Sequence, residues 1–315
     1  MGAVSEERQT LLYWAFHPDA EVPYDEALTE EAFVRRAREV VRLHMFMHNC
    51  SDLSPLRDFC ALRDLIVTLQ TIPRLEGLHN CLQLERLVLT EVKLAAIGGL
   101  DCCVRLRQLD LSRNRIRRIV GLDALAALET LWLNENQIAR IEGLHANRRL
   151  RTLWLARNHI AAIGESLDGS PQLRELNVAA NRLCSFRDIP NLARLRCLQT
   201  LTTSDPHYGP NPVCALYNYT TYCLYHLPQL VSLDLTTVSA ESRAAAEGTY
   251  AKKAIYYSMR IKAAQRLHAH ALGAAADARS ARAAQIALNL NALLRQRAGA
   301  AYALHRAAGG RRVPA

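Results

Sequence analysis

A pattern of apolar residues recurs every 22 residues through the middle of the chain, and it constrains the fold more than any other feature. Each copy reads LxxLxLxxNxI followed by xxIxxL. The most regular copy consists of Leu106, Leu109, Leu111, Asn114, Ile116, Ile119 and Leu122, and further copies begin at Leu128 and Leu150. Weaker copies extend back to Val40 and forward to Leu201, which makes about eight in all. A copy this short cannot bury its apolar side alone, so the copies must stack on one another.

The stacked copies predict an α/β solenoid, a right-handed leucine-rich-repeat horseshoe with short parallel strands on its concave face. In each LxL segment the leucines point inward, because side chains alternate between the two faces of a strand. The Asn of each copy is expected to be buried, with its amide bound to backbone groups that the tight bend leaves unpaired. Asn134, two residues before Asn136, is expected on the displayed surface.

The two ends of the repeat need caps. Residues 29–43, TEEAFVRRAREVVRL, predict a helix with Thr29 as its N-cap. We therefore expect an N-terminal segment and capping helix at 1–39, a repeat domain at 40–238 whose C-terminal cap spans 211–238, and a helical tail at 239–315. Ser239 is a suitable N-cap for this Ala-rich tail, which Gly248 and Gly273 are expected to interrupt.

The net charge of +9 is unevenly distributed along the chain. Residues 252–315 contain twelve Lys or Arg and one acid, Asp277, so this segment carries +11 and the remainder carries −2. A basic tail therefore follows a nearly neutral body. The tail residues expected to bind an acidic surface are Lys252, Lys253, Arg260, Lys262 and Arg266, although a run of basic residues can also be simply a solvated face.

The displayed face of the strands carries two tryptophans in equivalent positions. Since Leu131 and Leu133 point inward, Trp132 must point outward, and Trp154 must do the same on the next strand. Exposed indoles among charged groups are typical of protein-binding hot spots. The predicted concave binding site contains Trp132, Trp154, Asp110, Arg113, Glu135, Arg157 and Asn177. Two alternatives remain open: the rings stack only on each other, or the cap or tail of the same chain covers them.

The sequence contains no motif of a known catalytic or cofactor site. Phosphate-binding glycine loops, nucleophile elbows and metal-spaced Cys and His sets are all missing, so we expect no enzyme activity, no cofactor and no bound metal. No apolar run is long enough to span a bilayer, and we expect no membrane partner. The nine cysteines show no CxxC pair and are expected to be free buried thiols that fill core space, with Cys81 contacting Cys103.

The segment that ends the repeat resembles a known cap. NPVCALYNYTTYCLYHLPQLVSLD, residues 211–234, is similar to the C-terminal cap of the 22-residue leucine-rich-repeat subfamily. That subfamily includes the spliceosomal A-prime protein, a phosphatase-1 regulator and an axonemal dynein light chain. The residues that match the cap motif are Asn211, Pro212, Tyr219, Leu227, Pro228, Leu230, Leu233 and Asp234.

Residues 55–265 more closely resemble the first repeat block of the leucine-rich repeat-containing protein 9 family. This resemblance implies a non-catalytic, cytoplasmic scaffold of the cilium or flagellum axoneme that binds a protein through its concave face. It also implies that the basic tail meets tubulin or axonemal proteins. The alternatives are a nuclear, RNA-associated factor like the A-prime protein, with RNA at the tail, or a phosphatase regulatory protein.

Overall fold

The computed structural model describes residue 8, residues 29–46 and residues 53–308. Most of the predicted N-terminal segment, and residues 309–315 of the tail, lie outside the described residues. The chain forms two compact units, Met1–Thr249 and Tyr250–Ala315.

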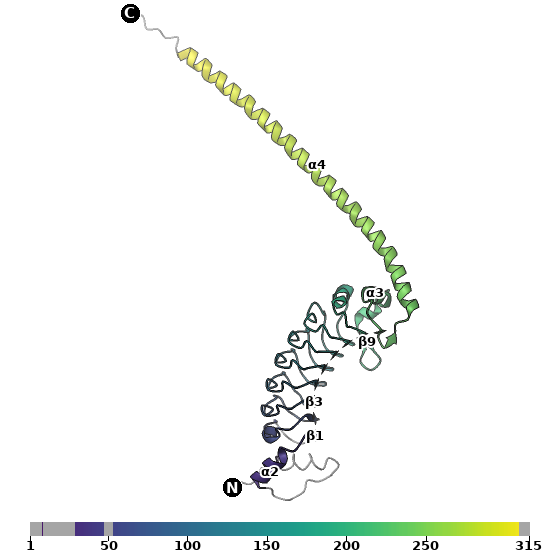
Figure 1. Ribbon diagram of the computed structural model, residues 1–315. Helices are drawn as coiled ribbons and strands as arrows, with labels where there is room; N and C mark the ends of the chain where they lie inside the picture. Colours follow the sequence, from purple (N-terminus) through teal and green to yellow (C-terminus); the bar gives the residue numbers. More distant parts are fainter. Residues whose placement is uncertain (1–7, 9–28, 47–52, 309–315) are drawn as a thin grey trace, which may run out of the picture. The chain divides into compact units, whose positions relative to one another are not determined.

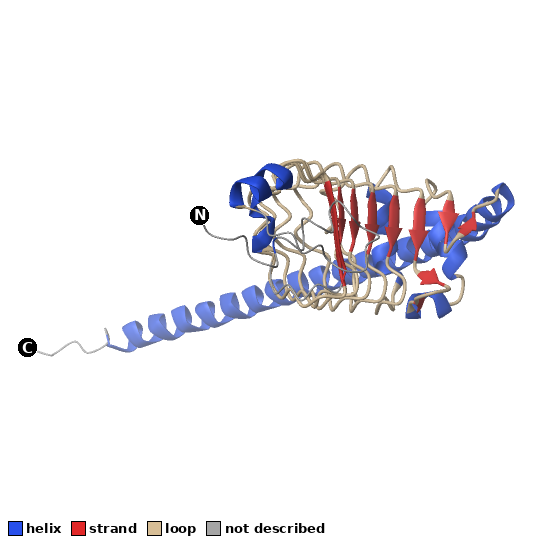
Figure 2. Ribbon diagram, turned by 90° about the horizontal axis from the view of Figure 1, so that it is seen from below, coloured by secondary structure: helices blue, strands red, loops and turns tan. Residues whose placement is uncertain are grey.

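The first unit is built on a sheet in which eight described strands run parallel in chain order. These strands line one side of a stack of coils (Figures 1 and 2). Equivalent residues of neighbouring copies pair directly, so that Leu109 lies opposite Leu131 and Leu131 opposite Leu153. The predicted solenoid is therefore confirmed. The strands are β1 (Arg42–Phe46), β2 (Asp64–Thr68), β3 (Arg86–Thr90), β4 (Gln108–Asp110), β5 (Thr130–Trp132), β6 (Thr152–Trp154), β7 (Glu175–Asn177) and β8 (Thr200–Thr202).

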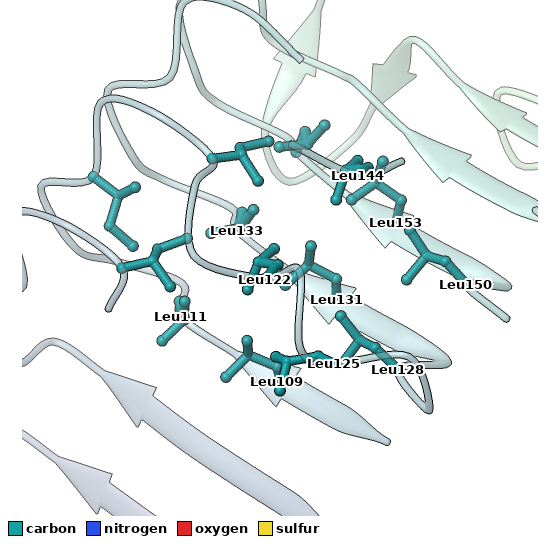
Figure 3. Close-up of a cluster of buried hydrophobic side chains, with 14 of the residues drawn as sticks. Leu109, Leu111, Leu122, Leu125, Leu128, Leu131, Leu133, Leu144, Leu150 and Leu153 are labelled. Atoms are coloured by element: carbon teal, nitrogen blue, oxygen red, sulfur yellow. The ribbon is translucent and has the colours of Figure 1, made fainter. Parts of the chain in front are cut away.

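The core is a continuous column of aliphatic side chains inside the coils. Leu109 and Leu111 of one coil, and Leu131 and Leu133 of the next, are fully buried and meet the leucines of the opposite wall (Figure 3). Each coil adds its own layer to this column. Burial of a leucine side chain contributes about 1.5–3 kcal/mol, so the repeat itself supplies most of the driving force for folding.

The asparagines of the repeat form a hydrogen-bonded ladder along the solenoid. Asn136 Oδ1 accepts from the Ile116 N–H at 3.0 Å, and its Nδ2 donates to the carbonyls of Leu111 and Leu133 at 3.0 and 3.1 Å. Asn114, Asn158 and Asn181 make the equivalent bonds in their own coils. The burial of these amides and their bonds to the backbone confirm the prediction, and each amide also links its coil to the preceding one.

The N-terminal helix is shorter than the sequence predicts. Helix α2 spans Glu30–Ala37, and the Oγ1 of its N-cap Thr29 accepts from the Ala32 N–H at 3.4 Å. The chain then enters β1, because Leu43 and Met45 are buried as the inward residues of a strand. A short 3₁₀ helix, η1 (Ser54–Asp58), begins the next coil.

The C-terminal cap closes the stack with a different set of elements. η2 (Phe186–Arg194) lies between β7 and β8, and β9 (Ser204–Asp205) and β10 (Gly209–Pro210) follow β8. The cap itself then contains η3 (Pro212–Ala215), α3 (Tyr219–His226), β11 (Ser232–Leu233) and β12 (Thr236–Thr237). The parallel sheet continues from β8 to β11, and β12 then pairs antiparallel at its edge.

The residues that match the cap motif have definite structural roles. Asn211 provides the last rung of the asparagine ladder: its Oδ1 accepts from Leu183 at 3.1 Å and its Nδ2 donates to Val178 at 2.7 Å. Asp234 Oδ1 accepts from the N–H groups of Thr203 and Ser204 at 2.7 and 2.9 Å. The cap therefore satisfies the backbone groups that the last coil leaves without a following coil.

The tail forms one helix, α4 (Ala240–Ala308), whose N-cap is Ser239 as predicted, with its Oγ accepting from Ser242 at 3.1 Å. The expected interruptions at Gly248 and Gly273 are wrong. A glycine in an exposed helix costs only about 1 kcal/mol relative to alanine, and the surrounding Ala-rich sequence outweighs that cost. Arg243 donates to the carbonyls of Pro228 and Leu230, and Ala246 is buried, so the first turns of α4 pack on the cap.

The expectation that the cysteines are buried is only partly right. Cys81, Cys103 and Cys223 are buried, whereas Cys60, Cys102, Cys184 and Cys197 are exposed. The exposed ones lie on the connecting segments between layers, where the repeat does not require an apolar residue. Burial, with smaller contributions from the neighbouring Cys103 and Cys60, raises the pKa of Cys81 to about 12. Within the described part of the chain, no helix is both long and apolar enough to cross a membrane.

Candidate protein-binding groove

The concave face carries one side chain per strand in a continuous central column. Asp110 lies opposite Trp132, Trp132 opposite Trp154, and Trp154 opposite Asn177. This register agrees with the column expected from strand alternation. A second column on the same face contains Gln108, Thr130, Thr152 and Glu175, two residues earlier on each strand.

These columns form the floor of an open groove of about 700 Å³. The groove contains both tryptophans, together with Asp110 and Glu175. Its remaining lining residues are Arg86, Val88, Thr90, Glu91, Gln108, Ser112, Arg113, Thr130, Asn134, Thr152 and Tyr208. Large aromatic side chains set among polar and charged groups are typical of a site that recognises another molecule.

The two indoles are half-buried, so each presents part of its ring to solvent. Trp154 is also held from the neighbouring strand, because its Nε1–H donates to Glu175 Oε1 at 3.0 Å. This bond fixes the ring before any partner arrives and lowers the entropic cost of ordering it on binding.

A row of alternating charges runs along the edge of the groove at the ends of the strands. Arg113 pairs with Glu91 at 2.8 Å and with Glu135 at 3.1 Å, and Arg157 pairs with Glu135 at 3.4 Å. The hydrogen bonds to Glu91 and Glu135 raise the pKa of Arg113 above its ordinary value. The predicted residues Arg113, Glu135 and Arg157 are therefore brought together, and with Glu91 they form a row of two positive and two negative charges.

The backbone at these charged positions is left-handed. Arg113, Glu135 and Arg157 have φ values of 57°, 54° and 56°. Such a conformation costs about 1–3 kcal/mol for a residue other than glycine, and here the ladder bonds of the following asparagine hold it. The turn is repeated in each coil, which is why the three side chains form a row.

Two polar residues of the concave face serve the fold rather than the surface. Asn177 is buried; its Oδ1 accepts from Ala179 at 3.0 Å and its Nδ2 donates to Asp205 at 3.4 Å. Asn134, expected on the displayed surface, is also buried, and its Oδ1 accepts from the Ala156 N–H at 2.9 Å. Asn134 therefore lies on the displayed face as expected, where it lines the groove, but its side chain is buried because its amide links two coils.

Tyr208 is a groove residue that the sequence did not reveal. It lies between β9 and β10, and Asp205 Oδ1 accepts from the N–H groups of His207 and Tyr208 at 2.8 and 3.3 Å. Partial burial raises the pKa of Tyr208, and the carboxylates of Glu135 and Asp205 add to the effect. Asp205-Pro206 and Gly209-Pro210 are signals of turns, but no local signal shows that this turn reaches the concave face.

The basic residues of the tail lie on α4. Lys252, Arg260, Lys262 and Arg266 are exposed, and Lys253 is partly covered. The Lys253 ammonium lies 4.8 Å from the ring centre of Tyr250, and the Arg260 guanidinium 5.8 Å from that of Tyr256. Among the described residues, no group of three or more His, Cys, Asp or Glu side chains could hold a metal ion.

Comparisons with known proteins agree with this architecture. A family model described as leucine-rich repeat matches residues 102–261, half of the chain. In the SNF/U2A' complex of Drosophila melanogaster, one chain is 31% identical over 42% of this chain and 75% of its own length, with a TM-score of 0.39. A leucine-rich-repeat protein of Leptospira interrogans is 19% identical over 65% of this chain and 50% of its own, with a TM-score of 0.54. Internalin C2 of Listeria monocytogenes is 20% identical over 62% and 93%, with a TM-score of 0.46.

Proposed function

The chain belongs to the leucine-rich-repeat family, and we propose that it is a non-catalytic scaffold that binds another protein through its concave face. The observation that carries this proposal is the pair Trp132 and Trp154, set side by side on adjacent strands in an open groove. The core of the coils is built from aliphatic residues, so the indoles are not needed to build it. Large aromatic rings in a partly desolvated groove are the side chains on which protein interfaces most depend.

The groove has the features that an interface requires. Its floor carries two tryptophans among polar side chains, and it is open to solvent over about 700 Å³. The charged groups along its edge discriminate between partners by electrostatic complementarity. The hairpin that contains Tyr208 lines the groove at one side, while both tryptophans stay partly accessible. If the cap or tail of the same chain covered the indoles, no partner could bind them. A binding experiment distinguishes this alternative from a partner site.

Affinity purification with matched variants tests the proposal. The tagged full chain is compared with Trp132→Ala/Trp154→Ala and with a control, Val104→Ala/Val120→Ala, which removes two exposed apolar side chains outside the groove. Proteins that the wild type and the control recover, and that the tryptophan variant loses while it stays folded, support the concave face. If all three chains recovered the same proteins equally, the binding site would lie elsewhere on the molecule.

We further propose that the protein acts in the cytoplasm, at the axoneme of a cilium or flagellum. The support is the resemblance of residues 55–265 to the leucine-rich repeat-containing protein 9 family. A fluorescently tagged full chain in ciliated cells is expected along the axoneme. A nuclear signal would instead favour the alternative of an RNA-associated factor.

The tail is proposed to attach the scaffold to an acidic surface such as the glutamate-rich tails of tubulin. Five basic residues of the tail lie in the second unit: Lys252, Lys253, Arg260, Lys262 and Arg266, all exposed except Lys253, which is partly covered. Replacing all five with Gln should weaken microtubule co-sedimentation, and replacing the four arginines Arg148, Arg149, Arg174 and Arg196 of the solenoid should not. Loss of single-stranded RNA binding, with a steep dependence on salt, would favour RNA instead.

A further inference from the structure

The groove carries uncompensated negative charge, on Asp110 and Glu175, beside its two tryptophans. We infer that it holds the positively charged side chain of an arginine or lysine from the partner, inserted between Trp132, Trp154 and Tyr208 and facing Asp110 and Glu175. This inference rests on the proposed function, because it names the chemistry of the segment that the concave face binds.

The arginines of the groove are already neutralised by carboxylates of the chain itself. Arg113 is paired with both Glu91 and Glu135, and Arg86 lies 3.7 Å from Asp64. An anionic partner group would have to break these pairs and leave a carboxylate uncompensated. The groove is therefore poorly suited to an acidic segment.

Two groove carboxylates, in contrast, have no cationic partner among the described residues. Asp110 accepts from the backbone N–H of Ser112 at 2.9 Å, and Glu175 accepts from the Trp154 indole at 3.0 Å. Both donors are neutral, so the two negative charges remain uncompensated within the site. Asp205 does not line the groove, but it accepts from the Tyr208 N–H, and among the described residues its hydrogen-bond donors are likewise neutral N–H groups.

The aromatic side chains supply the second requirement for binding a cation. Trp132 and Trp154 lie on adjacent strands, and Tyr208 lines the same groove. The face of an aromatic ring attracts a cation, most strongly for tryptophan, and a planar guanidinium can stack on it while donating to a carboxylate. A purely aliphatic partner segment would cover Asp110 and Glu175 without pairing them, and burying an unpaired charge is costly.

Selection from a random peptide library tests the inference even while the partner is unidentified. A library of dodecapeptides displayed on phage is selected on the full chain and counter-selected on Trp132→Ala/Trp154→Ala. We expect the surviving peptides to be enriched in arginine or lysine next to apolar residues. If peptides survive without this enrichment, the charge inference is wrong while the proposed function stands. If no selected peptide requires the tryptophans for binding, the proposed function itself is wrong, and the charge inference falls with it.

A second measurement uses the best selected peptide, labelled with fluorescein, in an anisotropy titration. Asp110→Asn/Glu175→Gln removes both charges but retains the oxygens that accept from Ser112 and Trp154. The matched control, Asp123→Asn/Glu142→Gln, removes two charges from the connecting segments outside the groove.

We expect the groove variant to bind the peptide at least about tenfold more weakly, since hydrogen bonds to charged groups contribute strongly, and the control to bind within about twofold. Replacing the peptide's basic residue with Ala should produce a similar loss in the wild type and little further loss in the groove variant. Equal weakening in the groove variant and the control would show only general attraction between opposite charges and would overturn the inference.

Discussion

The Trp154 indole on β6 donates a 3.0 Å hydrogen bond to the Glu175 carboxylate on β7. This bond places a negative charge directly beside one of the two indole rings of the groove. The bond orients the ring and leaves the second oxygen of Glu175 available for another donor. The side chain of Trp154 on β6 is therefore positioned by a residue of the neighbouring strand β7. The groove is a property of adjacent coils and not of any single repeat.

Removing this bond should loosen the indole without unfolding the chain. Glu175→Ala is expected to increase acrylamide quenching of tryptophan fluorescence, because Trp154 loses the partner of its N–H group. Glu175→Gln retains an acceptor oxygen and should behave like the wild type. Identical quenching in the two variants would show that packing alone holds the ring.

The asparagine ladder predicts an order of stability losses. Asn136→Ala leaves several backbone groups without partners and should lower the free energy of unfolding by about 3 kcal/mol. Asn134→Ala removes one buried bond and should cost about 1–2 kcal/mol. Asn80→Ala, whose side chain is exposed and bonds only to the Arg57 carbonyl, should cost under about 1 kcal/mol. Urea unfolding measures all three, and a different order would contradict the assignment of the ladder.

The buried thiols predict how stability changes at alkaline pH. Burial raises the pKa of Cys81 to about 12 and that of Cys103 to about 11. In the unfolded chain these thiols lose their protons near their ordinary pKa of about 8.5, while the folded chain keeps them protonated. Their contribution to stability is therefore complete below that pH and is lost progressively as pH rises from it toward the folded pKa values of about 11 and about 12.

The free energy of unfolding should then fall by up to about 4 kcal/mol from about pH 8 to about pH 10 because of these two groups. In Cys81→Ala/Cys103→Ala the fall should be smaller than in the wild type, although the variant starts from a lower stability. The exposed Cys60→Ala serves as the control and should follow the wild type. Parallel pH profiles for all three chains would contradict the role of burial.

Two truncations distinguish the part of α4 that belongs to the solenoid from the part that extends beyond it. A chain that ends at residue 250 keeps Arg243 and Ala246 on the cap and should melt within about 2 °C of the full chain. A chain that ends at residue 238 loses both contacts and should melt at least about 4 °C lower. Circular dichroism at 222 nm measures the two transitions. Equal melting of the two truncated chains would show that α4 contributes nothing to the cap.

The periodicity of the sequence predicted the fold because one residue pattern determines both the core and the register. Once Leu131 and Leu133 are placed inward, Trp132 must lie outward, and equal spacing sets it beside Trp154. The cap residue Asn211 was identifiable from its motif, although its role as a ladder rung was not, because it lies 30 residues beyond Asn181 instead of the usual 22.

The other features of the groove depend on contacts between distant residues. Tyr208 reaches the concave face from a turn after the last coil, and no local pattern shows where that turn lies. The left-handed backbone of Arg113 and Glu135 was likewise hidden, because neither is a glycine or an asparagine. Asn134 alternates like a surface residue, yet its amide bonds to the next coil at Ala156.

The affinity of one purified complex tests the central claim most directly. With the partner identified by purification, titration calorimetry on the wild type, Trp132→Ala/Trp154→Ala and Val104→Ala/Val120→Ala gives the three dissociation constants. The account predicts that loss of the two indoles weakens binding by about 2–4 kcal/mol, as truncation of hot-spot residues does, while the valine control binds like the wild type. A folded tryptophan variant that binds with the wild-type affinity would contradict recognition through the concave face.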